Sequence, residues 1–135
     1  FDGPAHGRST GRRTNLFEFR ETINRIYEMH GEPSAIIAHS FGGVAVLFAA
    51  MHGLPVRKLV NIASPSIGDE VIRTYLKAVN GSWSTGLFFK DYIKRTQGKT
   101  FDEFSSLHFV QNLPQPIDMM VVQDENDREV EMRHA

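Results

Sequence analysis

Residues 34–43 read SAIIAHSFGG, and this stretch decides the fold. The run of Ile, Ile and Ala at 36–38 is short and apolar on both faces, which predicts a buried strand ending at residue 39. Residues 41–52 are apolar almost all round, so they predict a helix that must be buried. Ser40 therefore lies on a sharp turn between a buried strand and a buried helix.

This turn makes Ser40 a candidate nucleophile. Ala38 and Gly42 flank it two residues before and two after, where larger side chains are expected to clash with the turn and the adjoining elements. The helix that follows directs free N–H groups toward developing negative charge, and the backbone N–H of Phe41 is a candidate oxyanion donor. The pattern alone occurs by chance in about one chain in ten. Its position after a strand and before a helix therefore carries the inference.

The rest of the chain continues the alternation of strands and helices. Residues 15–30 carry a helical apolar stripe, and residues 56–63 and 117–123 predict two further strands. This order, with strands apolar on both faces, predicts the α/β class with a parallel sheet and covering helices. The helical segment at 64–113 is too long for a minimal crossover, so we expect it to form a lid or cap insert.

Capping residues predict where the helices begin. Asn15, followed by Glu18, is expected to cap the helix over 15–30. Within 64–113 we expect three helices. The first is expected to be capped by Ser66 with Asp69, the second by Ser84 or Thr85, and the third by Thr100 with Glu103.

Composition excludes several functional classes. The 15 Lys and Arg against 16 Asp and Glu give a net charge of −1, which lacks the basic surface of a nucleic-acid-binding protein. The chain has no cysteine, which removes disulfides, thiolate metal sites and a cysteine nucleophile. No apolar run approaches the roughly 20 residues that cross a bilayer. We expect a cytoplasmic protein with no membrane span, no metal site and no cofactor.

Three motifs resemble those of the α/β-hydrolase superfamily, specifically its esterase-like and lysophospholipase-like members. Residues 38–43 match an A-H-S-x-G-G elbow. Residues 1–9, FDGPAHGRS, resemble the D-x-P-G-H-G-x-S loop after the family's fourth strand, with Ala5 in place of a glycine. Residues 121–130, VVQDENDREV, resemble the family's acid turn. The three motifs follow the family's order and cover essentially the whole chain.

The resemblance implies a serine hydrolase that cleaves carboxylic esters, with a small-molecule ester or acyl compound as its substrate. Ser40 would form the acyl-enzyme, and Asp127, with Asp124 as its competitor, would be the acid of the catalytic triad. The family's histidine lies beyond one further helix and strand after the acid, whereas only His134 follows Asp127 here. The resemblance therefore covers the central portion of a domain, with residues 1–135 as a partial domain.

A partial domain has physical consequences. The strand at 34–39 would have a bare edge, and the helices would expose apolar surface. We therefore expect the chain to be marginally stable and to associate with itself or with the remainder of a domain. Without the triad histidine it is expected to be close to inactive.

Other side chains are candidates for contacts near Ser40. His39 is expected to contact substrate or to pack near the elbow rather than act as base, because adjacent strand residues point to opposite faces. His108, in the insert, is a candidate pocket residue. Seven aromatic residues of the insert either pack against the core or form an apolar pocket for an acyl or aromatic group: Trp83, Phe88, Phe89, Tyr92, Phe101, Phe104 and Phe109.

Two alternatives remain open from the sequence. One is a different reaction on the same fold: perhydrolysis, C–C bond hydrolysis or acyl transfer. The other is a non-catalytic binding or scaffold domain that kept the elbow and lost the base.

Overall fold

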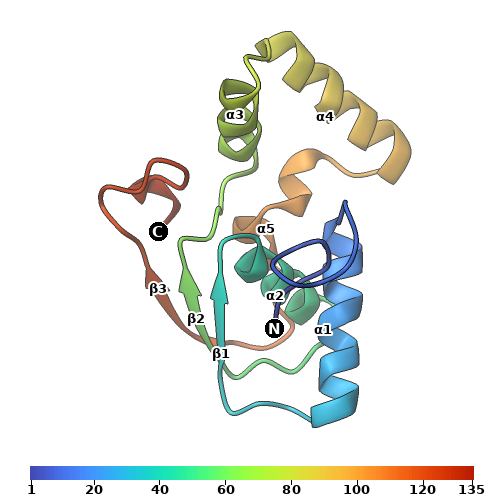
Figure 1. Ribbon diagram of the computed structural model, residues 1–135, viewed down its shortest axis with the longest axis vertical. Helices are drawn as coiled ribbons and strands as arrows, with labels where there is room; N and C mark the ends of the chain where they lie inside the picture. The colour runs from blue at the N-terminus through green and yellow to red at the C-terminus, as the bar shows by residue number, and fades with distance from the viewer.

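The computed structural model describes residues 1–135 and contains one three-stranded parallel sheet in the order β1-β2-β3. The strands are β1 (Ile36–His39), β2 (Lys58–Ile62) and β3 (Asp118–Val122). Their pairing places Ile37 beside Val60, and Val60 beside Met120. The three carboxyl ends therefore point to the same edge of the sheet (Figure 1). The predicted α/β class with a parallel sheet is confirmed.

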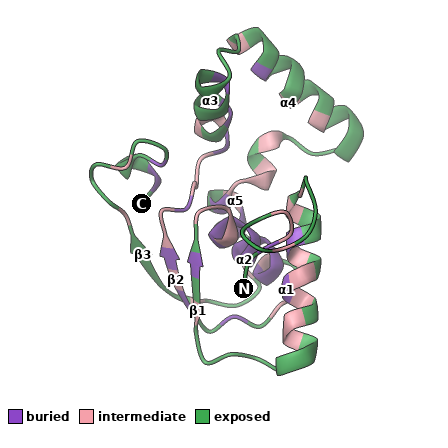
Figure 2. Ribbon diagram, in the orientation of Figure 1, coloured by how far each residue is buried: buried purple, intermediate pink, exposed green.

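Helices cover one face of this sheet. These are α1 (Leu16–His30), α2 (Phe41–Met51) and the short α5 (Ser106–Gln111), with α2 packed between the sheet and its neighbours. Figure 2 shows the buried residues concentrated in α2, with short buried stretches in β1 and β2, whereas β3 is exposed along its whole length. The largest fully buried side chains are Phe109, Leu47 and Leu59. The sequence-predicted burial of residues 41–52 is confirmed for all but the ends of this helix.

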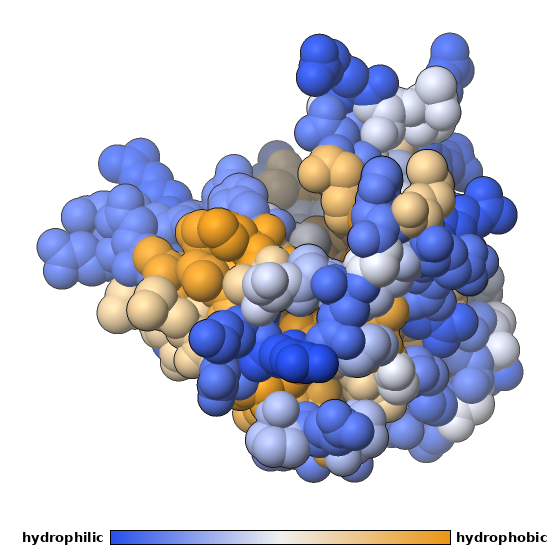
Figure 3. All heavy atoms as spheres, turned by 90° about the horizontal axis from the view of Figure 1, so that it is seen from below, coloured by the Kyte–Doolittle hydropathy of each residue, from blue (hydrophilic) through white to orange (hydrophobic).

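The opposite face of the sheet is uncovered. Ile37 is 74% exposed and Met120 is 62% exposed, and their cross-strand register places them on one face. β1 also lies at an edge of the sheet. Seen from below, apolar surface is concentrated on one side of the molecule (Figure 3). No helix of the structure is both long enough and apolar enough to cross a membrane.

The segment between β2 and β3 is helical throughout most of its length. It comprises α3 (Gly68–Ala78), α4 (Trp83–Gln97), the 3-10 turn η1 (Phe101–Phe104) and α5. Figure 1 shows α3 and α4 standing beyond the carboxyl ends of the strands. A second 3-10 turn, η2 (Met132–His134), follows β3 and its loop.

Two of the four predicted helix starts need correction. Asn15 accepts a hydrogen bond from the Glu18 N–H, and Thr100 forms its capping box with Glu103, although that box opens a 3-10 turn. α3 instead begins after Ile67, without a side-chain cap, because the Ser66 hydroxyl donates to the backbone carbonyl of His134. α4 is capped by Ser82, two residues before Ser84 and three before Thr85, so neither predicted hydroxyl is the cap.

Candidate functional site

Ser40 adopts a strained conformation between β1 and α2. Its φ of 52° and ψ of −126° lie in a region that residues with a Cβ rarely adopt, at a typical cost of about 1–3 kcal/mol. Its N–H donates to the Ile62 carbonyl of β2 over 2.9 Å, which ties the turn to the sheet. Its hydroxyl makes no capping bond to α2, so the ordinary role of a serine at a helix start is not used here. The side chain is left available for chemistry.

Behind this turn, the glycine that packs closely against Asn61 and Ser64 is Gly43, not Gly42. A Cβ at Gly43 would lie 1.8 Å from Asn61 Oδ1 and 2.7 Å from Ser64 Oγ, whereas one at Gly42 would meet nothing within 4 Å. The expected clash at Gly42 is therefore wrong for this structure. The first turn of α2 can approach β2 only because residue 43 has no side chain.

Asn61 and Ser64 are positions that the sequence pattern did not identify. Both residues are 6% exposed, and Asn61 Oδ1 and Ser64 Oγ are buried without a hydrogen-bond partner. A buried oxygen without a partner costs about 1–3 kcal/mol. Asn61 is a polar residue within the apolar run at the end of β2, after the exposed Lys58, and this is the signal that marks it in the sequence.

Asp127 lies in a tight turn after β3. One carboxylate oxygen accepts hydrogen bonds from the N–H groups of Glu129 (2.8 Å) and Val130 (3.0 Å), and the other accepts from the Gln123 amide (3.4 Å). These bonds lower the pKa of Asp127, led by the Val130 and Glu129 N–H groups, with a smaller contribution from His39. The carboxylate is thus held ionised at the carboxyl edge of the sheet. Asp127 forms no hydrogen bond with Ser40.

The competing acid, Asp124, has a simpler environment. One of its oxygens accepts from the Asn126 N–H over 2.8 Å, as in an Asx turn. The Asp124 side chain forms no other hydrogen bond. The fuller set of bonds on Asp127 agrees with its assignment as the functional carboxylate, which remains a prediction.

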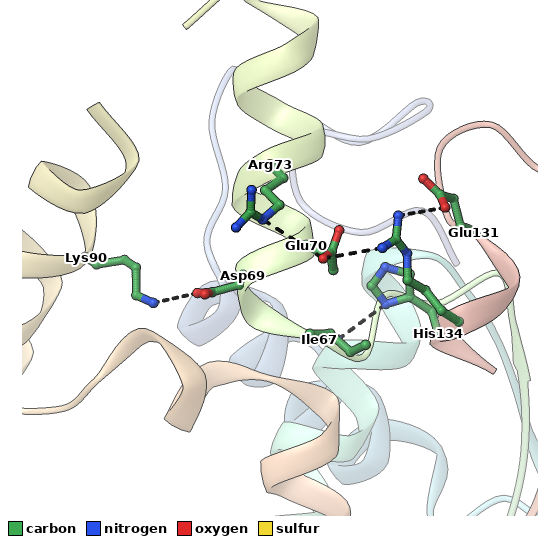
Figure 4. Close-up of polar contacts among 8 residues, drawn as sticks. Ile67, Asp69, Glu70, Arg73, Lys90, Glu131 and His134 are labelled. Atoms are coloured by element: carbon green, nitrogen blue, oxygen red, sulfur yellow. Dashed lines mark hydrogen bonds and ion pairs between the residues drawn. The ribbon is translucent and has the colours of Figure 1, made fainter. Parts of the chain in front are cut away.

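His134 is held in a tautomer that is unsuited to a triad base. Its Nδ1 accepts hydrogen bonds from the N–H groups of Ser66 (2.9 Å) and Ile67 (3.3 Å), so the ring proton lies on Nε2 (Figure 4). A triad histidine needs the reverse, with Nδ1–H donating to the acid. Burial lowers the pKa of His134, which keeps the ring neutral. The imidazole instead caps the start of α3 from 68 residues away.

Charged side chains surround this contact and link three elements. Arg133 pairs with Glu70 of α3 over 3.5 Å and with Glu131 over 2.7 Å, and Lys90 of α4 pairs with Asp69 of α3 (Figure 4). The C-terminal turn and α4 are therefore both attached to the first turn of α3 by polar contacts.

Two cavities lie on either side of the elbow. The first, here the serine cavity, has a volume of about 510 Å³ and contains Ser40 and His39. The second, here the apolar cavity, has a volume of about 450 Å³ and lies between the insert and the first turns of α1 and α2. Of the seven aromatic residues of the insert, those lining the apolar cavity are Phe89, Phe101 and Phe104. Phe41 alone lines both cavities.

The two candidate histidines occupy different places. His39 ends β1, is exposed and lines the serine cavity beside Ser40. His108 lies on α5, where its carbonyl and Nδ1 face the Asn112 amide, and it lines neither cavity. The expected pocket position of His108 is therefore corrected. No group of three or more metal-ligating side chains is present.

Comparison with known proteins identifies the fold alone. The sequence matches no family model, and no curated protein sequence matches it significantly. A solved structure, that of a lipase-esterase related protein from Clostridium acetobutylicum ATCC 824, superposes with a TM-score of 0.54 at 17% sequence identity. The match covers 96% of this chain but spans only 64% of that protein's chain. In its fold, the chain resembles part of an α/β-hydrolase.

Proposed function

We propose that this protein is a serine hydrolase that cleaves carboxylic esters, with Ser40 as the nucleophile. The observation that carries the proposal is the strained backbone of Ser40, whose hydroxyl is not used as a helix cap. A sharp strand-to-helix turn of this kind exposes a nucleophile in α/β-hydrolases. The fold match to a lipase-esterase related protein supports the same conclusion.

The proposed chemistry follows from the positions around the turn. The Ser40 hydroxyl attacks the acyl carbon, loses its proton to a base, and forms a tetrahedral oxyanion. Phe41 is the first residue of α2, so its N–H has no acceptor within the helix and can donate to that oxyanion. Collapse of the oxyanion expels the alcohol and leaves an acyl-enzyme, which water then hydrolyses.

Asp127 is proposed as the triad carboxylate, whose role is to orient the histidine base and stabilise its charged form. The hydrogen bonds from Glu129, Val130 and Gln123 keep it ionised for this role. No histidine donates to Asp127 or accepts from Ser40, and His134 has its Nδ1 occupied at α3. We therefore assign no histidine of this chain as the base.

The helical segment at 64–113 is proposed as a lid. Its helices stand beyond the carboxyl ends of the strands, and it supplies part of the lining of the apolar cavity (Figure 1). That cavity is lined by no charged residue, and its size falls in the range of small-molecule pockets. Its chemistry suits an uncharged acyl or aromatic group.

A labelling experiment tests the nucleophile. The full chain is incubated with a fluorophosphonate, with and without added imidazole, which replaces the unassigned base. We expect one adduct by intact mass, formed faster with imidazole, in the wild-type protein and in Ser84→Ala, an exposed serine of α4. The adduct is expected to be absent in Ser40→Ala. No adduct on a folded wild-type chain at high imidazole, or one that persists in Ser40→Ala, contradicts the proposal.

The two separate cavities favour one second function, a non-catalytic domain that binds an apolar ligand. Ser40 lines the serine cavity but not the apolar cavity, so a ligand in the latter need not touch it. Such a domain would bind the uncharged dye Nile red equally well in the wild type and in Ser40→Ala, without a fluorophosphonate adduct in either. Binding with an adduct favours the hydrolase.

A further inference from the structure

The two cavities meet at one side chain. Their linings share no residue except Phe41, the residue directly after the candidate nucleophile. The ring of Phe41 is partly buried and packs against the core. A group attached to Ser40 in the serine cavity therefore faces the Phe41 ring on its path to the apolar cavity.

Aromatic packing holds this ring in place. The Phe41 ring contacts Phe19 of α1 edge to face, with ring centroids 5.3 Å apart. Phe19 is itself buried, and its ring packs against His6 at 5.4 Å on the serine-cavity side. A Cβ at Gly3 would lie 1.9 Å from the Phe19 ring, so the N-terminal loop leaves Phe19 little room to move. The Phe41 ring, here called the wall between the two cavities, is thus supported from the side of the serine cavity.

The cavities on either side of the wall differ in chemistry. Asp2, His6, His39 and Ser40 give the serine cavity polar and titratable groups. The apolar cavity has no charged side chain, and most of its lining is hydrophobic, including Leu16, Val44 and Phe104; its polar lining residues, among them Asn15 and Gln97, are uncharged. A polar ester centre fits the first, and a hydrocarbon chain fits the second.

We infer that the Phe41 side chain determines substrate length: its ring confines the acyl group to the serine cavity and closes the apolar cavity to it. The inference rests on the proposed hydrolase and deepens it, because it assigns short acyl groups to the natural protein. Removing the ring would join the two cavities. A longer acyl chain could then extend from Ser40 into the apolar cavity.

The expected size of the effect follows from burying methylene groups. Each buried methylene contributes about 0.8 kcal/mol, which is about a fourfold change in affinity. Several additional methylenes in an opened cavity therefore predict that selectivity for an octyl over a methyl group rises at least about tenfold. A residue that lines only the apolar cavity should not produce this rise, because the wall stays in place.

The experiment measures this length selectivity without relying on catalysis. The chain has no cysteine, so Ser40→Cys introduces a single thiol at the elbow. Its thiolate attacks the sulfenyl sulfur of an alkyl methanethiosulfonate, forms a disulfide and expels methanesulfinate. Rates with the methyl and octyl reagents are followed by intact mass. The octyl-to-methyl ratio is expected to rise at least about tenfold in Ser40→Cys/Phe41→Ala.

Two further variants make the result decisive. Ser40→Cys/Phe104→Ala removes a ring that lines only the apolar cavity and should leave the ratio unchanged. Ser40→Cys/Phe41→Leu keeps apolar bulk at the wall, protects the test against a Phe41→Ala variant that does not fold, and should give an intermediate ratio. Equal ratios in the folded Phe41 and Phe104 variants overturn the inference.

The outcome also separates this inference from the proposed hydrolase. If the octyl-to-methyl ratio does not rise in Ser40→Cys/Phe41→Ala while the wild type forms a fluorophosphonate adduct on Ser40, only the role of Phe41 is overturned. If the ratio rises but the wild type forms no such adduct, Phe41 does separate the two cavities and the proposed hydrolase function is overturned.

Discussion

The elbow helix α2 and the helix α4 of the insert are held in different ways. Every residue from 43 to 50 of α2 is buried, whereas α4 buries only Gly86. α4 contacts α3 and η1 and is tied to α3 by the Lys90–Asp69 ion pair. Dense apolar packing of α2, together with the bond from the Ser40 N–H to the Ile62 carbonyl, can maintain the strained backbone of Ser40. Polar contacts between exposed helices supply much less constraint.

The largest expected loss of stability comes from truncating a core side chain of α2. Leu47 is 1% exposed, so Leu47→Ala should lower the free energy of unfolding by about 2–5 kcal/mol through lost burial and a residual cavity. Urea unfolding followed by far-UV circular dichroism measures the change. A loss below about 1 kcal/mol would show that α2 is not the packed centre of the molecule.

A smaller loss is expected from filling the contact behind the elbow. Gly43→Ala places a Cβ against Asn61 Oδ1 and Ser64 Oγ, and such overpacking typically costs about 1–3 kcal/mol. Gly42→Ala is the matched control, because it meets open space and gains up to about 1 kcal/mol of helix propensity. Both are measured by the same urea titration. Equal effects of the two substitutions would refute the assignment of the close approach to residue 43.

The polar attachment of α3 predicts a dependence of stability on pH. The pKa of His134 is lowered in the folded state, first by burial and then by Arg133, against the opposing effects of Glu70 and Glu131. The unfolded chain therefore takes up the proton first as the pH falls below the ordinary histidine value of 6.5. The stabilisation is complete above that pH and is lost as the pH falls through it toward the lower folded pKa.

His134→Asn tests this dependence. Asparagine offers an acceptor near the position of Nδ1 and does not titrate, so the difference between wild type and variant isolates this one group. Urea midpoints at pH 8 and pH 5 should differ more in the wild type than in His134→Asn. The same pH dependence in both proteins would show that another group is responsible.

The smallest effect is expected on the exposed side of α4. Leu87 is 53% exposed, and Leu87→Ala should change stability by no more than about 0.5 kcal/mol. It is the matched partner of Leu47→Ala, since the chemical change is identical and only the burial differs. A loss comparable to that at Leu47 would mean that α4 is covered in solution.

Local patterns predicted the framework of this protein. Runs that are apolar on both faces predicted β1 and β2, and the helical stripe after Asn15 predicted α1 together with its cap. The strand-to-helix turn at Ser40 was predicted in the same way. These features depend on residues within a few positions of one another, so periodicity and capping chemistry are sufficient to identify them.

Contacts between distant segments decided the remainder. Gly43, not Gly42, is the residue that must lack a side chain, because β2 brings Asn61 against it. Ser66 does not cap α3, because the turn at His134 folds back and supplies the acceptor. Phe41 lines both cavities only because α1, β1 and the insert all approach the first turn of α2. Sequence spacing carries no information on such approaches, since they depend on how whole elements pack in three dimensions.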